Sequence, residues 1–153
     1  MPDEIDQLQV ELQEMVLAEA RKLYSDIVID HAMNPRNAGE MNDADGYGSA
    51  VGSCGDDMEM WLRVRNGTIV EASFFTNGCS TTIASGSMIT EMVKGKPVME
   101  AQKISQQDVL TALDGLPADS EHCAQLAANT LKEAIKDHLK LQREPWKKAY
   151  RKN

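Results

Sequence analysis

The chain lacks the features that would place it in a membrane, on a nucleic acid or in an oxidising compartment. Its 153 residues contain no apolar run of about 18, the length that a membrane-spanning helix needs. With 16 basic against 24 acidic side chains, it has no basic excess to bind a phosphate backbone. Only three cysteines are present, an odd number that cannot all pair within the chain. We therefore expect reduced thiols, a cytoplasmic protein, and neither a nucleic-acid nor a membrane partner.

Helical periodicity marks both ends of the chain. Apolar residues recur at steps of three and four from Ile5 to Ile27, which predicts a helix that continues until Asn34-Pro35 ends it. A second apolar stripe, at positions 123–139, predicts a last helix capped by Ser120. Residues 132–153 carry 8 basic and 3 acidic side chains. They form either a solvated helix end or a docking tail for an acidic protein partner.

Alternation of apolar and polar residues indicates two strands in the middle of the chain. Positions 58–65 alternate, Asn66-Gly67 predicts a hairpin turn, and a return strand follows from about Thr68 to Thr76. The inner face of the return strand is predicted to consist of Val70, Ala72 and Phe74. An ideal two-residue turn would instead pair Val64 with Ile69, so we expect a bulge or a longer turn.

The order of these elements predicts the fold class. Residues 37–55 are rich in Gly, Asn and Asp, and we expect a loop there. Strands grouped early and helices grouped late predict an α+β domain, in which helices pack on one face of an antiparallel sheet. No linker divides the chain, which suits a single domain of this length.

The three cysteines all fall at junctions between loops and predicted elements. Cys54 lies in a small-residue loop before the first predicted strand, Cys79 opens a helix, and Cys123 lies in the first turn of the last helix. Helix N-termini lower the pKa of a thiol, so these settings favour the thiolate. A single cysteine of this kind is as often a small buried hydrophobe. The spacings of 25 and 44 residues match no zinc-finger pattern.

Asp56 lies two residues after Cys54, and His122 directly precedes Cys123. Either side chain could complete a four-ligand set with the three thiolates. Zinc accepts either ligand, and iron–sulfur clusters accept thiolates with an occasional histidine. The sequence leaves the choice between them open, and a centre without a fourth thiolate should be labile. A thiol hydrolase with Cys123 as nucleophile is a weaker alternative, because we expect His31 to serve in hydrogen bonding and His138 to be solvated.

Short segments around these residues carry a likeness to a known family. In chain order they are Tyr24–His31 with Asn34–Asn37, Cys54-Gly55-Asp56, Asn77-Gly78-Cys79 with Ile83-Ala84-Ser85, and His122-Cys123 with Leu126-Ala127. Their combination resembles the IscU/NifU N-terminal family of iron–sulfur cluster assembly scaffolds. The resemblance implies a three-stranded antiparallel sheet and one domain over residues 1–153. Within it we expect an N-terminal helical extension (1–21), a family core (22–142) and a basic tail (143–153).

The resemblance also implies a function and partners. The three cysteines would receive sulfur from a cysteine desulfurase and hold a 2Fe–2S cluster for transfer to apo-proteins, as a scaffold and not an enzyme. Asp56 resembles the aspartate associated with cluster lability, and His122 resembles the alternative fourth ligand. Zinc is implied as an occupant of the cluster-free site. The N-terminal extension departs from the family pattern, and it could dock in cis or mediate self-association as a homodimer.

Two further comparisons with the family pattern bear on the function and partners that the resemblance implies. A zinc-dependent persulfide acceptor of the SufU type is the alternative, but the separation of 44 positions between Cys79 and Cys123 leaves no room for the insertion of those relatives. Scaffolds served by a dedicated Hsp70-type chaperone carry Leu-Pro-Pro-Val-Lys before the His-Cys pair. Here residues 116–121 read Leu-Pro-Ala-Asp-Ser-Glu, which argues against that chaperone.

Overall fold

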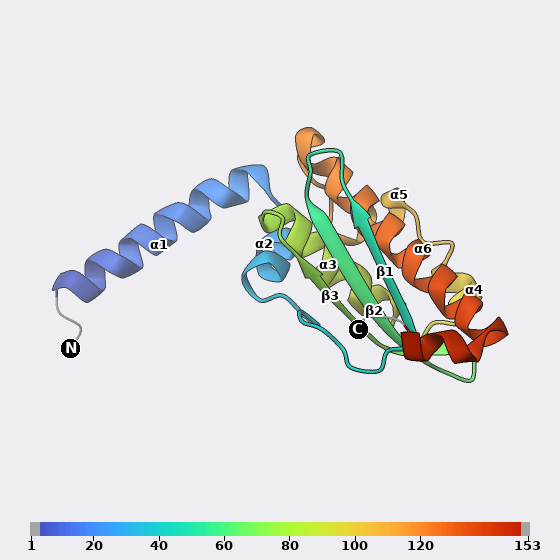
Figure 1. The fold of residues 1–153 in the computed structure, drawn as a ribbon. Coiled ribbons are helices and arrows are strands. Elements are labelled where there is room, and N and C mark those ends of the chain that lie inside the picture. The colour runs from blue at the N-terminus through green and yellow to red at the C-terminus, as the bar shows by residue number, and fades with distance from the viewer. Residues whose placement is uncertain (1–3, 151–153) are drawn as a thin grey trace.

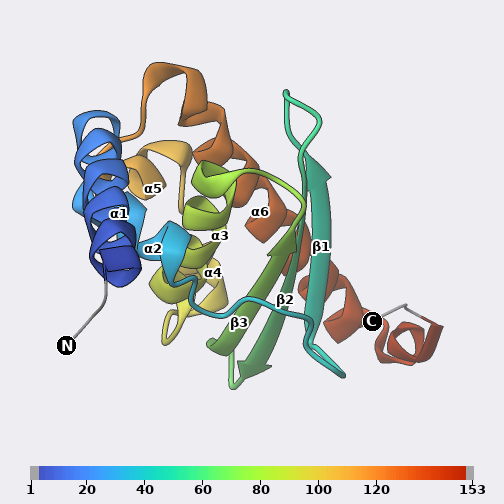
Figure 2. The same ribbon diagram turned by 90° about the vertical axis from the view of Figure 1, so that its left-hand side faces the viewer.

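A computed structural model describes residues 4–150 and shows a three-stranded antiparallel sheet with helices packed on one face (Figures 1 and 2). The strands lie in the order β1-β2-β3. The elements are α1 (Glu4–Leu23), α2 (Asp26–Met33), β1 (Gly46–Val51), β2 (Asp57–Arg65), β3 (Thr68–Thr76), α3 (Ser80–Val93), α4 (Val98–Ala101), α5 (Gln106–Ala112), the 3-10 turn η1 (Ala118–Ser120), α6 (Glu121–Arg143) and the 3-10 helix η2 (Pro145–Tyr150). The predicted α+β class is confirmed.

The strand β1 is the element that the sequence pattern did not reveal. The loop expected over residues 37–55 is wrong for Gly46–Val51, because two glycines interrupt the apolar alternation. These glycines let α6 lie directly on the strand: a Cβ on Gly48 would stand 2.3 Å from the backbone nitrogen of Ala134. This close approach lays α6 along β1 and brings the start of α6 toward the loop between β1 and β2 (Figure 1).

The hairpin of β2 and β3 contains the expected bulge. Arg65 pairs with Thr68 and Val64 with Ile69, and the register then shifts between Arg63 and Val64. The extra residue reverses the facing of β3 near the turn, so Ile69 is buried and Val70 is exposed. The predicted inward position of Val70 is therefore wrong.

The core lies between the sheet and the two helices α3 and α6. α3 packs on β3, α6 packs on β1 and β2, and the two helices also contact each other (Figure 2). On the opposite face of the sheet, Trp61 is buried in a small cluster with Met41 and Ala44. His138, expected to be solvated, is buried, and its Nδ1 lies 3.0 Å from the carbonyl oxygen of Asp45. Ser120 precedes α6, but its side chain makes no cap hydrogen bond.

The N-terminal helical segment is two helices rather than one. Ser25 ends the continuity: its hydroxyl caps α2 by accepting from the Val28 amide and donates to the carbonyl oxygen of Leu113 at 2.6 Å. α1 projects away from the sheet and has no buried residue (Figure 1). Leu17 and Ala20 are half-buried, and seven large apolar residues of α1 are exposed: Ile5, Leu8, Val10, Leu12, Met15, Val16 and Leu23. Within residues 4–150, no helix has the length and apolar character needed to cross a membrane.

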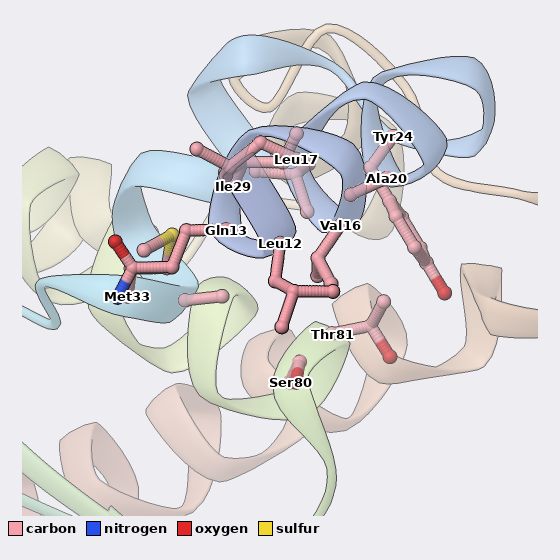
Figure 3. Close-up of a pocket in the computed structure, with 12 residues that line it drawn as sticks. Leu12, Gln13, Val16, Leu17, Ala20, Tyr24, Ile29, Met33, Ser80 and Thr81 are labelled. Atoms are coloured by element: carbon pink, nitrogen blue, oxygen red, sulfur yellow. The ribbon is translucent and has the colours of Figure 1, made fainter. Parts of the chain in front are cut away.

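A groove of about 610 Å³ separates α1 from the domain (Figure 3). Leu12 and Val16 of α1 line one side, Ile29 and Met33 of α2 line another, and Thr81 in the first turn of α3 lies at its end. The groove between the extension and the domain therefore reaches the helix that begins after Cys79.

Candidate functional site

The three cysteines are delivered by three different junctions of the fold. Cys54 lies in the loop between β1 and β2, Cys79 is the N-cap residue of α3, and Cys123 is the third residue of α6. All three are free thiols; Cys54 and Cys79 are exposed and Cys123 is buried. The predicted positions of Cys79 and Cys123 at helix starts are confirmed.

The imidazole of His122 lies between two of the sulfurs. Its Nε2 is 3.1 Å from Cys54 Sγ and 3.7 Å from Cys123 Sγ. In a tetrahedral zinc site with bonds of 2.0–2.3 Å, ligand atoms stand about 3.3–3.8 Å apart. The His122–Cys123 separation already has this length, and the His122–Cys54 separation is that of a hydrogen bond. Adjacent positions on α6 thus do place both side chains at one point.

Two threonines connect the remaining predicted residues, and the sequence interpretation did not include them. The Thr81 hydroxyl lies 3.1 Å from Cys79 Sγ and 3.4 Å from Cys123 Sγ. The Thr82 hydroxyl lies 3.3 Å from Cys123 Sγ and donates to the Asp56 carboxylate at 3.0 Å. The contacts therefore link all five predicted residues, with Cys79 and Asp56 joined to the others through hydroxyls. The sequence offered one signal for Thr81 and Thr82, which is their position in the first turn of the helix that begins after Cys79.

The surroundings of Cys79 lower the pKa of its thiol. A hydrogen bond from the Thr81 hydroxyl is the largest cause, and the backbone N–H groups of Thr81 and Thr82 add to it, so that the pKa of Cys79 falls to about 7. About half of the Cys79 side chains are then thiolate at neutral pH, as the helix N-terminus led us to expect.

Cys123 differs, and the expectation that every setting favours thiolate is wrong for it. Burial raises the pKa of Cys123, against the lowering effect of the neighbouring Thr81 and Thr82 hydroxyls. The proximity of Cys79 and Cys54 raises the pKa of Cys123 further. A thiol in this position releases its proton readily only when a cation compensates the charge.

The donors lie close together without forming a finished metal cage. Within residues 4–150, no three His, Cys, Asp or Glu side chains are already arranged to hold a metal ion. The contacts present are hydrogen bonds: thiol to imidazole, thiol to hydroxyl, and hydroxyl to carboxylate. The donor set of three sulfurs with an imidazole and a carboxylate suits zinc or an iron–sulfur cluster chemically. Binding requires the hydrogen bonds to be exchanged for metal bonds.

Comparison with curated proteins places the chain among proteins of similar sequence. It is 48% identical over 120 residues to "Iron-sulfur cluster assembly scaffold protein IscU 1" of Archaeoglobus fulgidus, covering 77% of this chain and 78% of that protein. It is 45% identical over 120 residues to "Iron-sulfur cluster assembly scaffold protein IscU" of Escherichia coli, covering 75% and 93%. The relative of the same name from Aquifex aeolicus is 44% identical over 119 residues, covering 76% of each chain.

Solved structures with lower sequence identity share the fold. A NifU-like protein (N-terminal) from Brucella abortus matches with a TM-score of 0.64 at 15% identity, covering 77% of this chain and 95% of that one. A putative iron–sulfur cluster assembly scaffold protein for the SUF system from Fervidobacterium islandicum matches with a TM-score of 0.62 at 21% identity, covering 73% and 96%. The family model described as "NifU-like N terminal domain" matches residues 23–144. The chain belongs to the NifU-like N-terminal domain family.

Proposed function

We propose that this protein is a scaffold on which an iron–sulfur cluster is assembled and from which it is handed to other proteins. The observation that carries the proposal is the convergence of three free cysteines with His122 and Asp56 at one end of the domain. The names of curated relatives at 44–48% identity support it, since all three are called assembly scaffold proteins. The cluster is then cargo, and the protein is not an enzyme.

The chemistry begins with sulfur transfer from a cysteine desulfurase. A thiolate of the site attacks the outer sulfur of the desulfurase persulfide, the S–S bond of that persulfide breaks, and the desulfurase thiolate leaves. Conversion of the new persulfide to sulfide needs two electrons from an external thiol reductant. Because Cys54 and Cys79 are exposed, the site is open to both the sulfur donor and the cluster recipient.

We propose a 2Fe–2S cluster bound by Cys54, Cys79 and Cys123, with Asp56 or His122 as the fourth ligand. His122 contacts the sulfur of Cys54 directly, and Asp56 is joined to the sulfur of Cys123 through the Thr82 hydroxyl. An oxygen or nitrogen ligand binds cluster iron more weakly than a fourth thiolate would. A weak ligand suits a scaffold, which has to release its cluster. Zinc would be accepted by the same donors in the cluster-free site.

The partners follow from this function. They are a cysteine desulfurase as sulfur donor and apo iron–sulfur proteins as recipients, in the cytoplasm, where thiols stay reduced. We propose further that a second copy of the chain covers the exposed apolar face of α1. Acidic residues lie in the first turn of α1 and basic residues in its last turn, so two such helices complement each other when they run antiparallel.

Anaerobic reconstitution tests the proposal against its alternative. The metal-free chain is incubated with iron, cysteine, a desulfurase and dithiothreitol, then analysed by visible absorption and by iron, sulfide and zinc content. Sulfide-to-iron charge-transfer bands, equal iron and sulfide, and transfer to an apo-ferredoxin are expected. A colourless protein that keeps about one zinc and refuses iron would instead establish the zinc-dependent persulfide acceptor.

The proposed role of Asp56 has its own test. In Asp56→Ala the weak oxygen ligand is absent, and we expect the reconstituted protein to keep its colour longer than wild type when exposed to a chelator. The decay of visible absorbance measures this lifetime. Faster loss of colour would contradict the role of Asp56 in cluster release.

A further inference from the structure

Thr82 is a buried polar residue at the centre of the site. The side chain is fully buried, and its hydroxyl is the point at which the Asp56 carboxylate and the Cys123 sulfur meet. The Oγ1 atom is 3.0 Å from Asp56 Oδ2, 3.3 Å from Cys123 Sγ and 3.7 Å from Cys79 Sγ. No other described side chain has contacts this close to both a carboxylate and two sulfurs of the site.

The donors and acceptors around Thr82 determine which group receives the proton of its hydroxyl. A hydroxyl has a single proton to donate, and a carboxylate can only accept, so the proton of Thr82 is directed at Asp56. A hydrogen bond to a charged acceptor is stronger than one to a neutral thiol. The bond occupies one carboxylate oxygen, and the second oxygen is left to bind a metal. The loop that carries Asp56 is thereby tied to the first turn of α3.

The position of Thr82 is itself constrained by the backbone before α3. Gly78 packs directly on it: a Cβ at Gly78 would stand 2.7 Å from the Cβ, Cγ2 and Oγ1 atoms of Thr82. Three atoms of one short, branched side chain cannot all move aside while the hydroxyl stays in place. The Thr82 hydroxyl is therefore held by packing, which is the condition for it to position another group.

We infer that Thr82 is a positioning residue, whose hydroxyl holds the Asp56 carboxylate beside Cys123 so that an incoming metal ion meets both. The inference rests on the proposed function, in which Asp56 is a ligand. It adds that Asp56 acts from a fixed place and that a buried neutral hydroxyl supplies the fixing. Residues that hydrogen-bond metal ligands in this way typically contribute 10–100-fold to metal affinity.

The test measures the affinity of the metal-free chain for Co²⁺. Binding is monitored through the visible absorption bands of thiolate-bound cobalt. Thr82→Val keeps the shape of the side chain and removes the hydroxyl, and we expect Co²⁺ binding to weaken at least about tenfold. Thr82→Ser restores the hydroxyl and should bind within about twofold of wild type. Thr90→Val is the matched control, because Thr90 is a buried threonine of the same helix whose hydroxyl bonds only described backbone carbonyls and Asn37.

A double-mutant cycle separates positioning from simple packing. If Thr82 acts through Asp56, adding Thr82→Val to Asp56→Ala should change Co²⁺ affinity by less than about twofold. A full tenfold effect in the Asp56→Ala background, or wild-type affinity of Thr82→Val, would overturn the inference. Gly78→Ala is a second variant that displaces Thr82 without removing any donor, and it should reproduce the loss seen in Thr82→Val.

A measurement without metal completes the test. Removal of the Thr82 hydroxyl should raise amide hydrogen exchange in residues 52–57 about fivefold, since one hydrogen bond ties this loop to α3. Unchanged exchange would count against the inference. Failure of the proposed function has a different signature: a chain that shows the Thr82–Asp56 coupling with Co²⁺ but builds no cluster refutes the scaffold and leaves the positioning role intact.

Discussion

The pKa of Cys79 offers the sharpest check on the site as the structure shows it. The Thr81 hydroxyl is the largest cause that lowers this pKa to about 7. Thr81→Val keeps the volume of the side chain and removes the hydroxyl, so the Cys79 pKa should rise toward its ordinary value near 8.5. The backbone N–H groups of Thr81 and Thr82 remain and lower the pKa of Cys79, while the partial burial of the thiol raises it.

The magnitude decides which observable to follow. At pH 7, a thiol of pKa about 7 is half ionised, and one of pKa about 8.5 is only about 3% ionised, roughly a fifteenfold difference. The more basic thiolate is intrinsically about five times more nucleophilic, by a Brønsted coefficient of 0.4–0.5. The rate at pH 7 therefore falls only about threefold. The midpoint of the pH–rate profile, in contrast, moves by the full change in pKa and is the better readout.

The assay is alkylation of the metal-free chain by iodoacetamide between pH 5.5 and 9.5, with Cys79 quantified by peptide mass spectrometry. Wild type should show a midpoint near pH 7 and Thr81→Val a midpoint clearly above 7.5. Thr130→Val is the control, because that buried hydroxyl bonds the carbonyl oxygen of Leu126 in α6 and should leave the midpoint unchanged. A midpoint that stays near 7 in Thr81→Val would refute the reasoning and assign the low pKa to the helix N-terminus alone.

Three further predictions concern the fold. Gly48→Ala would place a Cβ 2.3 Å from the Ala134 nitrogen and separate β1 from α6. The free energy of unfolding in urea should therefore fall by at least about 3 kcal/mol. A decrease below about 1 kcal/mol would mean that α6 moves aside freely. Ser25→Ala removes the cap of α2 and the donor to Leu113, and should cost about 1–2 kcal/mol in the same assay; no loss would show that the cap does not matter. Deletion of residues 1–23 removes a helix with no buried residue, so the thermal midpoint should change by no more than about 4 °C, and light scattering should report loss of the dimer proposed above. A collapse of the thermal midpoint would show that α1 belongs to the domain, and an unchanged mass would remove the dimer through α1.

The sequence alone predicted the parts of this structure that depend on local pattern. Helix starts at Cys79 and Cys123, the Asn66-Gly67 hairpin and its bulge all follow from neighbouring residues, and each is confirmed. β1 did not follow, because a strand built around Gly46 and Gly48 shows no alternation until the helix packed on it is known. The division of the chain at residues 21 and 142, and the roles of the site residues, stay predictions.

At the site, too, the sequence did not reveal the features that depend on tertiary contacts. The five predicted residues are polar or thiol groups at loop junctions, which a sequence reveals. Thr81 and Thr82 are ordinary helix residues until α6 brings the Cys123 sulfur to within 3.4 Å of both hydroxyls. Their role depends on the tertiary contact between α3 and α6, and no pattern along the chain encodes the distance.

The fold also makes three similar thiols chemically unequal. Cys54 is exposed and touches an imidazole, Cys79 is exposed with a pKa near 7, and Cys123 is buried with a raised pKa. A single environment for all three would either keep three negative charges together without a metal, at high cost, or protonate all of them and leave no nucleophile at neutral pH. The observed division avoids both states. In the proposed function, Cys79 would supply thiolate before metal arrives, and a bound cation would displace the proton of Cys123. The burial of one cysteine beside two exposed ones thus suits the proposed function, in which the site would react first and bind metal afterwards.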